Sequence, residues 1–142
     1  MFKRIVAATD FSESSRRGVD LAVDLARLHG AELVLLHVIE PFIPPYPIAL
    51  APEPGTLEGA ARAALETELS QVREVLPAAR GELLRGSPSH ELTKFAEEQG
   101  ADLLVIGTHG RKGPSRWILG SVAERVVRSS RAPVLTVRGE DS

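Results

Sequence analysis

Apolar residues are arranged in two patterns that alternate along the 142-residue chain. In one pattern they form short continuous runs, partly β-branched, such as "RIVAAT" and "LLVIG". In the other they recur every three or four positions between charged residues. Continuous runs are typical of strands buried on both faces, and the longer period is typical of amphipathic helices.

The continuous runs predict five strands, at residues 4–9, 31–40, 81–86, 101–107 and 132–138. The helical pattern predicts four helices, at residues 12–29, 57–76, 88–99 and 121–130. Ser12 is placed to cap the first helix at its amino end, and Gly30 is placed to end it in a left-handed conformation.

Alternating strands and helices predict an α/β fold with a parallel sheet and helices on both faces. Two strand orders are compatible with the pattern: 2-1-3-4-5 and 3-2-1-4-5, the second being half of a dinucleotide-binding fold. Ligands bind such sheets where the strand order reverses, at the carboxyl ends of the strands. The loop after the fourth strand lies there only in the order 3-2-1-4-5, which a functional loop would therefore favour.

The length predicts a single domain, residues 1–142, since a chain of this size buries roughly 70% of its unfolded surface. Residues 41–56 hold six of the ten prolines and exceed the ~12–15 residues of an ordinary loop. We expect a flap or mobile loop there, and a short flexible tail at residues 139–142.

Composition excludes several classes of function. A formal net charge of −2 and an aromatic content of 4% give no attraction to nucleic acid and no base-stacking surface. No apolar run approaches the ~18 residues of a membrane span. Cysteine is absent, which excludes disulfides and thiolate metal sites. With no signal peptide visible, we expect a cytoplasmic protein.

A glycine pattern, "GTHGRKGPSRWILGS" at residues 107–121, joins the fourth strand to the last helix. Gly107 and Gly110 follow the strand, whereas Gly120 and Ser121 stand where the helix begins. Glycine lets the backbone approach a phosphate closely, and a helix amino end offers free N–H groups. The alternative is an ordinary loop that uses glycine for turns and serine as a cap. Spacing alone leaves both interpretations open.

Asp10 follows the first strand at the same predicted edge. Its carboxylate could accept hydrogen bonds from an adenine amino group or from ribose hydroxyls; alternatively it ends the strand or helps Ser12 to cap the first helix. His109 lies inside the glycine pattern, where it could contact a ligand. His37 lies inside a strand and is expected to be a hydrogen-bonded core residue. No histidine spacing predicts a metal site, and no pair of acids indicates acid–base catalysis.

Four stretches together resemble the universal stress protein family in its small single-domain form. They are "RIVAATDFSESS", "ELVLLHVIE", "GSPSHELTKFAEEQGADLLVIGTHGRKG" and the glycine pattern, which matches the G-x2-G-x9-G-[ST] spacing of the family's ATP-binding branch. The resemblance extends over essentially the whole chain. It departs from the family at Gly113-Pro114, which stiffens the middle of the loop.

The resemblance implies a half-Rossmann, adenine nucleotide alpha hydrolase-like fold with strand order 3-2-1-4-5, and homodimers joined through the last strand at residues 133–137. It implies ATP at the ends of strands 1 and 4, with Mg²⁺ or Mn²⁺ held mainly by the phosphates. The residues expected on the adenine and ribose side are Ala8, Thr9, Asp10 and, through its backbone, Val38. Those expected along the ribose and phosphates are Gly107, His109, Gly110, Arg111, Gly120, Ser121 and Val122.

Three functions remain to be weighed. The first is an ATP-binding stress-response regulator with little turnover, because a phosphate pattern stands without an evident catalytic base. The second is a slow ATP hydrolase or phosphotransferase that uses Asp10 or His109. The third is a nucleotide-free dimeric scaffold, against which the intact glycine pattern argues.

Overall fold

A computed structural model of the chain describes residues 1–41, 45–50, 55–108 and 120–139. The strands are β1 (Arg4–Ala8), β2 (Glu32–Ile39), β3 (Arg80–Arg85), β4 (Leu103–Gly107) and β5 (Val134–Val137). The helices are α1 (Glu13–His29), α2 (Thr56–Arg73), α3 (Pro88–Glu98) and α4 (Ser121–Ser129), with a short 3-10 helix η1 (Ile48–Leu50). The five expected strands and four expected helices are all present, with ends shifted by a few residues.

The strands form one parallel sheet in the order β3-β2-β1-β4-β5. This confirms the order 3-2-1-4-5 and excludes 2-1-3-4-5. β1 is central, since Ile5 is aligned with Leu33 of β2 on one side and with Leu103 of β4 on the other. The carboxyl ends of β1 and β4 are therefore neighbours.

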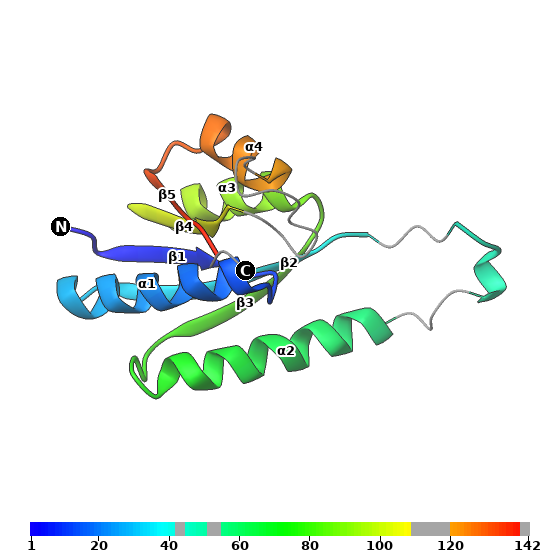
Figure 1. Ribbon diagram of the computed structural model, residues 1–142, viewed down its shortest axis with the longest axis horizontal. Helices are drawn as coiled ribbons and strands as arrows, with labels where there is room; N and C mark the ends of the chain where they lie inside the picture. The colour runs from blue at the N-terminus through cyan, green and yellow to red at the C-terminus, as the bar shows by residue number, and fades with distance from the viewer. Residues whose placement is uncertain (42–44, 51–54, 109–119, 140–142) are drawn as a thin grey trace.

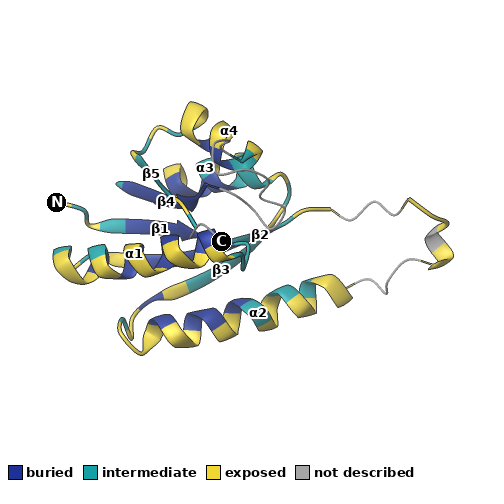
Figure 2. Ribbon diagram, viewed as in Figure 1, coloured by how far each residue is buried: buried dark blue, intermediate teal, exposed yellow. Residues whose placement is uncertain are grey.

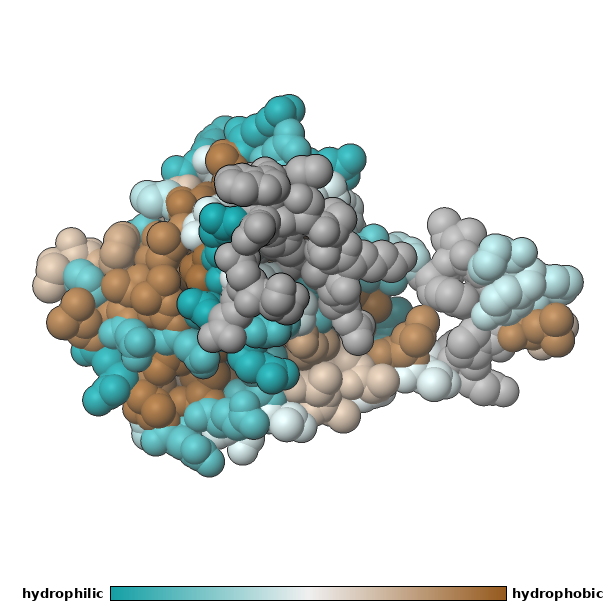
Figure 3. All heavy atoms as spheres, in the orientation of Figure 1, coloured by the Kyte–Doolittle hydropathy of each residue, from teal (hydrophilic) through white to brown (hydrophobic). Residues whose placement is uncertain are grey.

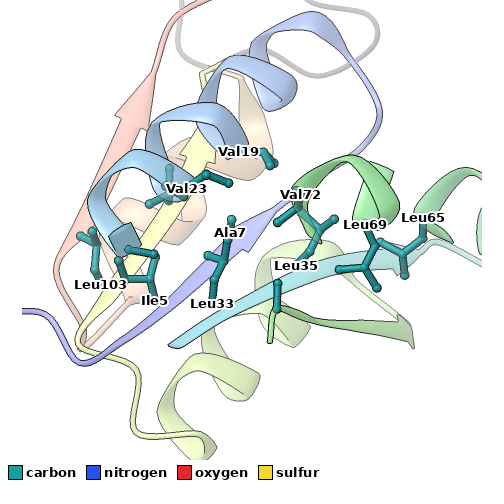
Figure 4. Packing of buried hydrophobic residues seen from close by; sticks show 14 residues of the cluster. Ile5, Ala7, Val19, Val23, Leu33, Leu35, Leu65, Leu69, Val72 and Leu103 are labelled. Carbon is teal, nitrogen blue, oxygen red and sulfur yellow. The ribbon is translucent and has the colours of Figure 1, made fainter. Parts of the chain in front are cut away.

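Helices cover both faces of the sheet (Figure 1). Helices α1 and α2 pack on one face over Ile5 and Ala7, and α3 and α4 pack on the other over Val6 and Ala8. Figure 4 shows the first of these layers, with side chains of α1 and α2 directed onto β1 and β2. Because side chains alternate across a strand, Thr9, the residue after Ala8, belongs to the α1/α2 side.

Burial falls from the centre of the sheet to its edges (Figure 2). All five residues of β4 and four of the five in β1 are buried, as their continuous apolar runs predict. The edge strands β3 and β5 contain no buried residue. The fully buried strands are thus the two whose ends form the predicted ligand edge.

Helix α1 begins and ends where the sequence indicates. The Ser12 hydroxyl accepts a hydrogen bond from the Ser15 N–H at 3.3 Å. Gly30 has the left-handed φ of 66° that favours glycine, and its N–H donates to the Ala26 carbonyl. The amino end of α1 is thereby fixed beside the carboxyl end of β1.

The proline-rich segment is described only in part. Its described residues 45–50 contain η1, which proline content did not predict, and they stand away from the sheet (Figure 1). Residues 42–44 and 51–54, and residues 140–142 of the expected tail, lie outside the described part of the chain. Within the described residues, no helix has the length and apolar character needed to cross a membrane.

Candidate ligand site at the strand ends

Backbone hydrogen bonds bring the start of α4 to the end of β4. Thr108, just beyond β4, donates its N–H to the Val137 carbonyl at 2.9 Å. Its own carbonyl accepts the Gly120 N–H at 2.6 Å. The two described ends of the glycine pattern therefore meet at the carboxyl end of β4, beside β1.

Thr9 is the centre of a hydrogen-bond network at the end of β1. Its side chain is buried, and its N–H still bonds to the Leu36 carbonyl of β2 at 2.9 Å. The Thr9 hydroxyl donates to Oε2 of Glu68 at 3.0 Å and accepts the Phe11 N–H at 3.1 Å. The Thr9 hydroxyl thus links Glu68 of α2 to the turn after β1 by hydrogen bonds.

Asp10 shapes the turn that follows. Its Oδ1 accepts the Ser12 N–H at 2.9 Å, and its own N–H lies 3.3 Å from the Ser15 hydroxyl. Asp10 therefore stabilises the turn that leads into α1, as one of the two interpretations of this residue predicts. Asp10 lies at the site edge, and its role toward a ligand stays a prediction.

Phe11 has a left-handed φ of 67°, which costs a residue with a side chain roughly 1–2 kcal/mol. Two contacts hold it there: the bond from its N–H to Thr9, and its ring, whose centroid lies 4.5 Å from that of His37. His37 Nδ1 is 2.7 Å from the Thr9 carbonyl, so this nitrogen carries a proton. His37 is half-buried and hydrogen-bonded, in line with the expectation for a core histidine.

Gly107 allows the first turn of α1 to pack directly on β4. A Cβ atom at this position would lie 2.8 Å from the Ser14 backbone carbon, the Ser14 hydroxyl and the Ser15 nitrogen. No side chain fits in that space. The glycine therefore has a structural reason that the sequence pattern did not reveal, whatever contact it makes with a ligand.

Among the described residues, no side chain caps the amino end of α4. Gly120, with φ of −60° and ψ of 153°, is the N-cap residue, and Ser121 is the first helical residue. The alternative interpretation, in which Ser121 caps this helix, is therefore excluded, because the cap position lies one residue earlier. Uncapped N–H groups at a helix amino end favour anions.

Most predicted site residues gather at this edge of the sheet. Ala8, Thr9 and Asp10 lie at the end of β1, Gly107 at the end of β4, and Gly120, Ser121 and Val122 at the start of α4. Val38 is buried near the end of β2, the other neighbour of β1. His109, Gly110, Arg111 and the Gly113-Pro114 pair lie outside the described residues.

Glu68 of α2 is the site residue that sequence reasoning missed. It lies between Leu65, Leu69 and Val72 on the buried stripe of the helix, where an acid interrupts an apolar pattern. That interruption is the signal that could have found it. Burial raises the pKa of Glu68, although the hydrogen bond from Thr9 acts in the opposite direction.

The described residues contain no group of three or more histidine, aspartate or glutamate side chains placed to hold a metal ion. The chemistry at this edge is instead that of hydrogen bonds and a helix amino end. Backbone N–H groups, hydroxyls and the carboxylates of Asp10 and Glu68 lie near the place where β1 and β4 end. Such groups suit a ligand that has both anionic and hydroxyl-bearing parts.

The fold and the site define a class: a half-Rossmann α/β domain with its ligand edge at the switch point between β1 and β4. The model of the Universal stress protein family matches residues 1–138. The chain belongs to the universal stress protein family.

Two relatives match nearly the whole of this chain. The chain is 33% identical to a universal stress protein of Methanocaldococcus jannaschii, over 97% of this chain and 83% of the relative. It is 37% identical to universal stress protein A homolog 1 of Coxiella burnetii, over 96% of each.

Two similar solved structures are complexes with adenine nucleotides. A universal stress protein in complex with cAMP has a TM-score of 0.71 and 28% identity, with 96% of each chain covered. The Archaeoglobus fulgidus universal stress protein in complex with dAMP has a TM-score of 0.66 and 25% identity, covering 96% of this chain and 98% of that one.

Proposed function

We propose that this chain binds ATP between the ends of β1 and β4 and acts as a nucleotide-dependent regulator rather than a fast enzyme. The observation that carries the proposal is the bond between Thr108 and Gly120. It brings the amino end of α4 to the carboxyl end of β4, the strand that pairs with β1, and the turn at Asp10 follows β1. Nucleotide complexes of similar proteins support the ligand class.

The two sides of the site suit different parts of a nucleotide. The amino end of α4, with Gly120, Ser121 and Val122, suits the phosphates because its N–H groups and dipole favour negative charge. The turn after β1, with Thr9 and Asp10, suits the ribose and adenine. In this proposal His109, Gly110 and Arg111 follow the ribose and first phosphates, and Mg²⁺ or Mn²⁺ binds mainly to the phosphates.

Titration of Mg-ATP into wild type, Gly120→Val and Ser121→Ala tests the site. Gly120 has φ of −60°, which valine can adopt, so a loss of binding would report blocked access and not backbone strain. We expect Gly120→Val to weaken binding at least tenfold and Ser121→Ala by a few-fold, on the order of one hydrogen bond. Ser129→Ala, at the other end of α4, is the control.

Equal Mg-ATP affinity in all four proteins would refute this site. Turnover is tested separately, by phosphate release in single-turnover experiments with wild type and Asp10→Asn. Because Asp10 already accepts the Ser12 N–H, we expect binding without rapid hydrolysis. Fast release that Asp10→Asn abolishes would favour a phosphohydrolase instead.

We also propose that two copies pair through β5. This strand lies at the edge of the sheet, and its side chains are only partly buried. In Figure 3 apolar residues gather over the side of the molecule that carries β4 and β5. An unpaired apolar edge is a natural surface for a second copy of the same chain across a two-fold axis.

A further inference from the structure

Glu68 is an acid placed where a helix should be apolar. It is 8% exposed and lies among the residues of α2 that pack on the sheet. Oε2 accepts a hydrogen bond from Thr9, whereas Oε1 is buried and has no hydrogen-bond partner among the described residues. Burying such a group lowers stability, so packing alone does not account for it.

The Thr9 hydroxyl has two neighbouring oxygens to which it could donate a hydrogen bond, but it has only one proton. It lies 3.0 Å from Glu68 Oε2, 3.1 Å from the Phe11 nitrogen and 3.3 Å from the Ser15 hydroxyl. A hydroxyl has one proton and two lone pairs. The Phe11 N–H requires one lone pair, so the proton can go only to Glu68 or to Ser15.

The protonation state of Glu68 decides between those two arrangements. An ionised Glu68 only accepts, so the Thr9 proton points to it. A protonated Glu68 can donate to Thr9, whose own proton then turns toward the Ser15 hydroxyl. Ser15 in turn lies against the Asp10 N–H and donates to the Ser12 carbonyl at 3.0 Å. A change at Glu68 thus reaches the Asp10 N–H through three hydrogen bonds, by way of Thr9 and Ser15.

We propose that Glu68 is a positioning residue for nucleotide binding: acting through the Thr9 hydroxyl, it orients the turn at residues 10–12 that forms the β1 side of the site. The inference rests on the proposed nucleotide function. Glu68 itself need not touch the nucleotide. Its effect is on the direction of the Asp10 carboxylate and on the left-handed backbone of Phe11.

Charged groups on the surrounding elements act on Glu68. Arg16 of α1 favours the ionised form of Glu68, whereas Asp20 of α1 and Asp10 disfavour it. From β2, His37 contacts the carbonyl of the same Thr9. From β3, Arg85 is paired with Glu58 of α2. Burial outweighs the favourable contacts and raises the pKa of Glu68, so its proton is released at a higher pH than that of an ordinary glutamate.

Mg-ATP titrations of wild type, Glu68→Leu and Glu68→Gln give the first test. Leucine removes the acceptor for Thr9, and we expect about tenfold weaker binding, whereas the glutamine oxygen can still accept and should restore affinity to within about threefold. Glu66→Leu, on the exposed side of the same helix, should bind as wild type does. Glu68→Leu binding within about twofold of wild type would overturn the inference.

A pH profile keeps the test independent of the leucine variant's stability. The ratio of wild-type to Glu68→Gln affinity, taken from about pH 5 to 8, cancels the titration of the nucleotide and of all other side chains. We expect this ratio to change across the range because only wild type titrates at position 68. A constant ratio would overturn the inference.

Backbone amide NMR of the nucleotide-free protein separates this inference from the proposed function. We expect the Phe11 and Ser12 amide signals to titrate in wild type with a transition that is absent in Glu68→Gln. That result supports positioning of the turn by Glu68 even if wild type fails to bind Mg-ATP, which would defeat the proposed function alone. Identical titrations in both proteins would overturn the inference, whatever the nucleotide affinity.

Discussion

Gly107 is required by the packing of the fold, although its sequence pattern indicates a role in ligand binding. Its place after β4 is typical of a phosphate-binding loop, yet the backbone of Ser14 and Ser15 occupies the space that a side chain would need. The two explanations predict different effects of substituting Gly107. If its role is structural, the substitution lowers stability in the absence of a ligand; if its role is to bind a ligand, the substitution lowers the affinity for that ligand.

Gly107→Ala should lower the free energy of unfolding by about 1–3 kcal/mol, as overpacking does in a dense interior. The measurement is chemical denaturation without nucleotide. Gly59→Ala is the matched control, since a Cβ there meets nothing within 4 Å and helix α2 should gain about 0.5–1 kcal/mol. An unchanged stability for Gly107→Ala would show that α1 can move away from β4.

Asp102 is an acid whose role is structural, at the opposite end of the sheet. Its carboxylate accepts the Lys3 N–H at 2.8 Å and the Arg4 N–H at 3.1 Å. Burial alone would raise the pKa of Asp102, but these two hydrogen bonds, the backbone N–H of Asp102 and the charge of the chain's amino terminus together lower it. A carboxyl group with a lowered pKa in the folded state stabilises the fold above its unfolded pKa of about 3.9.

Asp102→Asn should therefore be less stable than wild type at neutral pH, because the amide offers one acceptor oxygen in place of two. The difference should shrink as pH falls below about 3.9 and the wild-type carboxylate takes up a proton. Urea denaturation across pH measures it. Asp24→Asn, exposed on α1, is the control and should show no such pH dependence.

At the scale of elements, hydrophobic periodicity was sufficient to predict every strand and every α-helix. Such patterns are local, and the described elements are long enough to show them. Element ends were less certain, as at α2, which ends at Arg73 and not at residue 76. Periodicity alone did not decide the strand order, because pairing joins segments far apart in the sequence; the glycine pattern and the family resemblance favoured 3-2-1-4-5.

Features that depend on contacts between elements could not be predicted. The left-handed Phe11 has no local signal, since its conformation depends on Thr9 and on the ring of His37. Glu68 could have been noticed as an acid on an apolar stripe, but its partner belongs to β1. Both lie at the candidate site, where tertiary contacts override local preference.

The amino end of α1 offers a test at this scale. Ser12→Ala removes the cap on the Ser15 N–H and should cost about 1 kcal/mol of unfolding free energy. Ser12→Asp keeps an acceptor and a favourable charge at the helix amino end, and should remain close to wild type. Equal stability of the alanine and wild-type proteins in urea denaturation would show that the 3.3 Å contact contributes nothing.

For the whole molecule, the proposed pairing through the edge strand β5 can be tested at a single backbone N–H. The Pro133 and Val137 carbonyls accept hydrogen bonds from Leu104 and Thr108 on the β4 side. Because backbone groups alternate in direction along a strand, the Thr136 N–H points to the open edge. Proline at position 136 therefore removes an outward donor and leaves pairing with β4 in place.

Thr136→Pro should shift the molecular mass in sedimentation equilibrium from dimer toward monomer, if two copies pair through β5. Thr136→Ser keeps the N–H and is the control. Urea denaturation of Thr136→Pro serves as the check on folding, since the substitution leaves the pairing of β5 with β4 in place. A dimer that persists unchanged in Thr136→Pro would show that β5 is not the contact.

The central place of β1 also bears on how the protein is made. The Lys3 N–H and the Asp102 carboxylate, which are hydrogen-bonded just before β1 and β4 begin, are 99 residues apart along the chain. A ribosome adds about 5–20 residues per second. The segment that forms β4 is therefore made roughly 5–20 s after β1, and until then β4 cannot pair with β1. A nascent chain that stops before β4 has only half of the strand ends that surround the site. If nucleotide binds there as proposed, it would therefore bind only to a chain whose synthesis has passed β4.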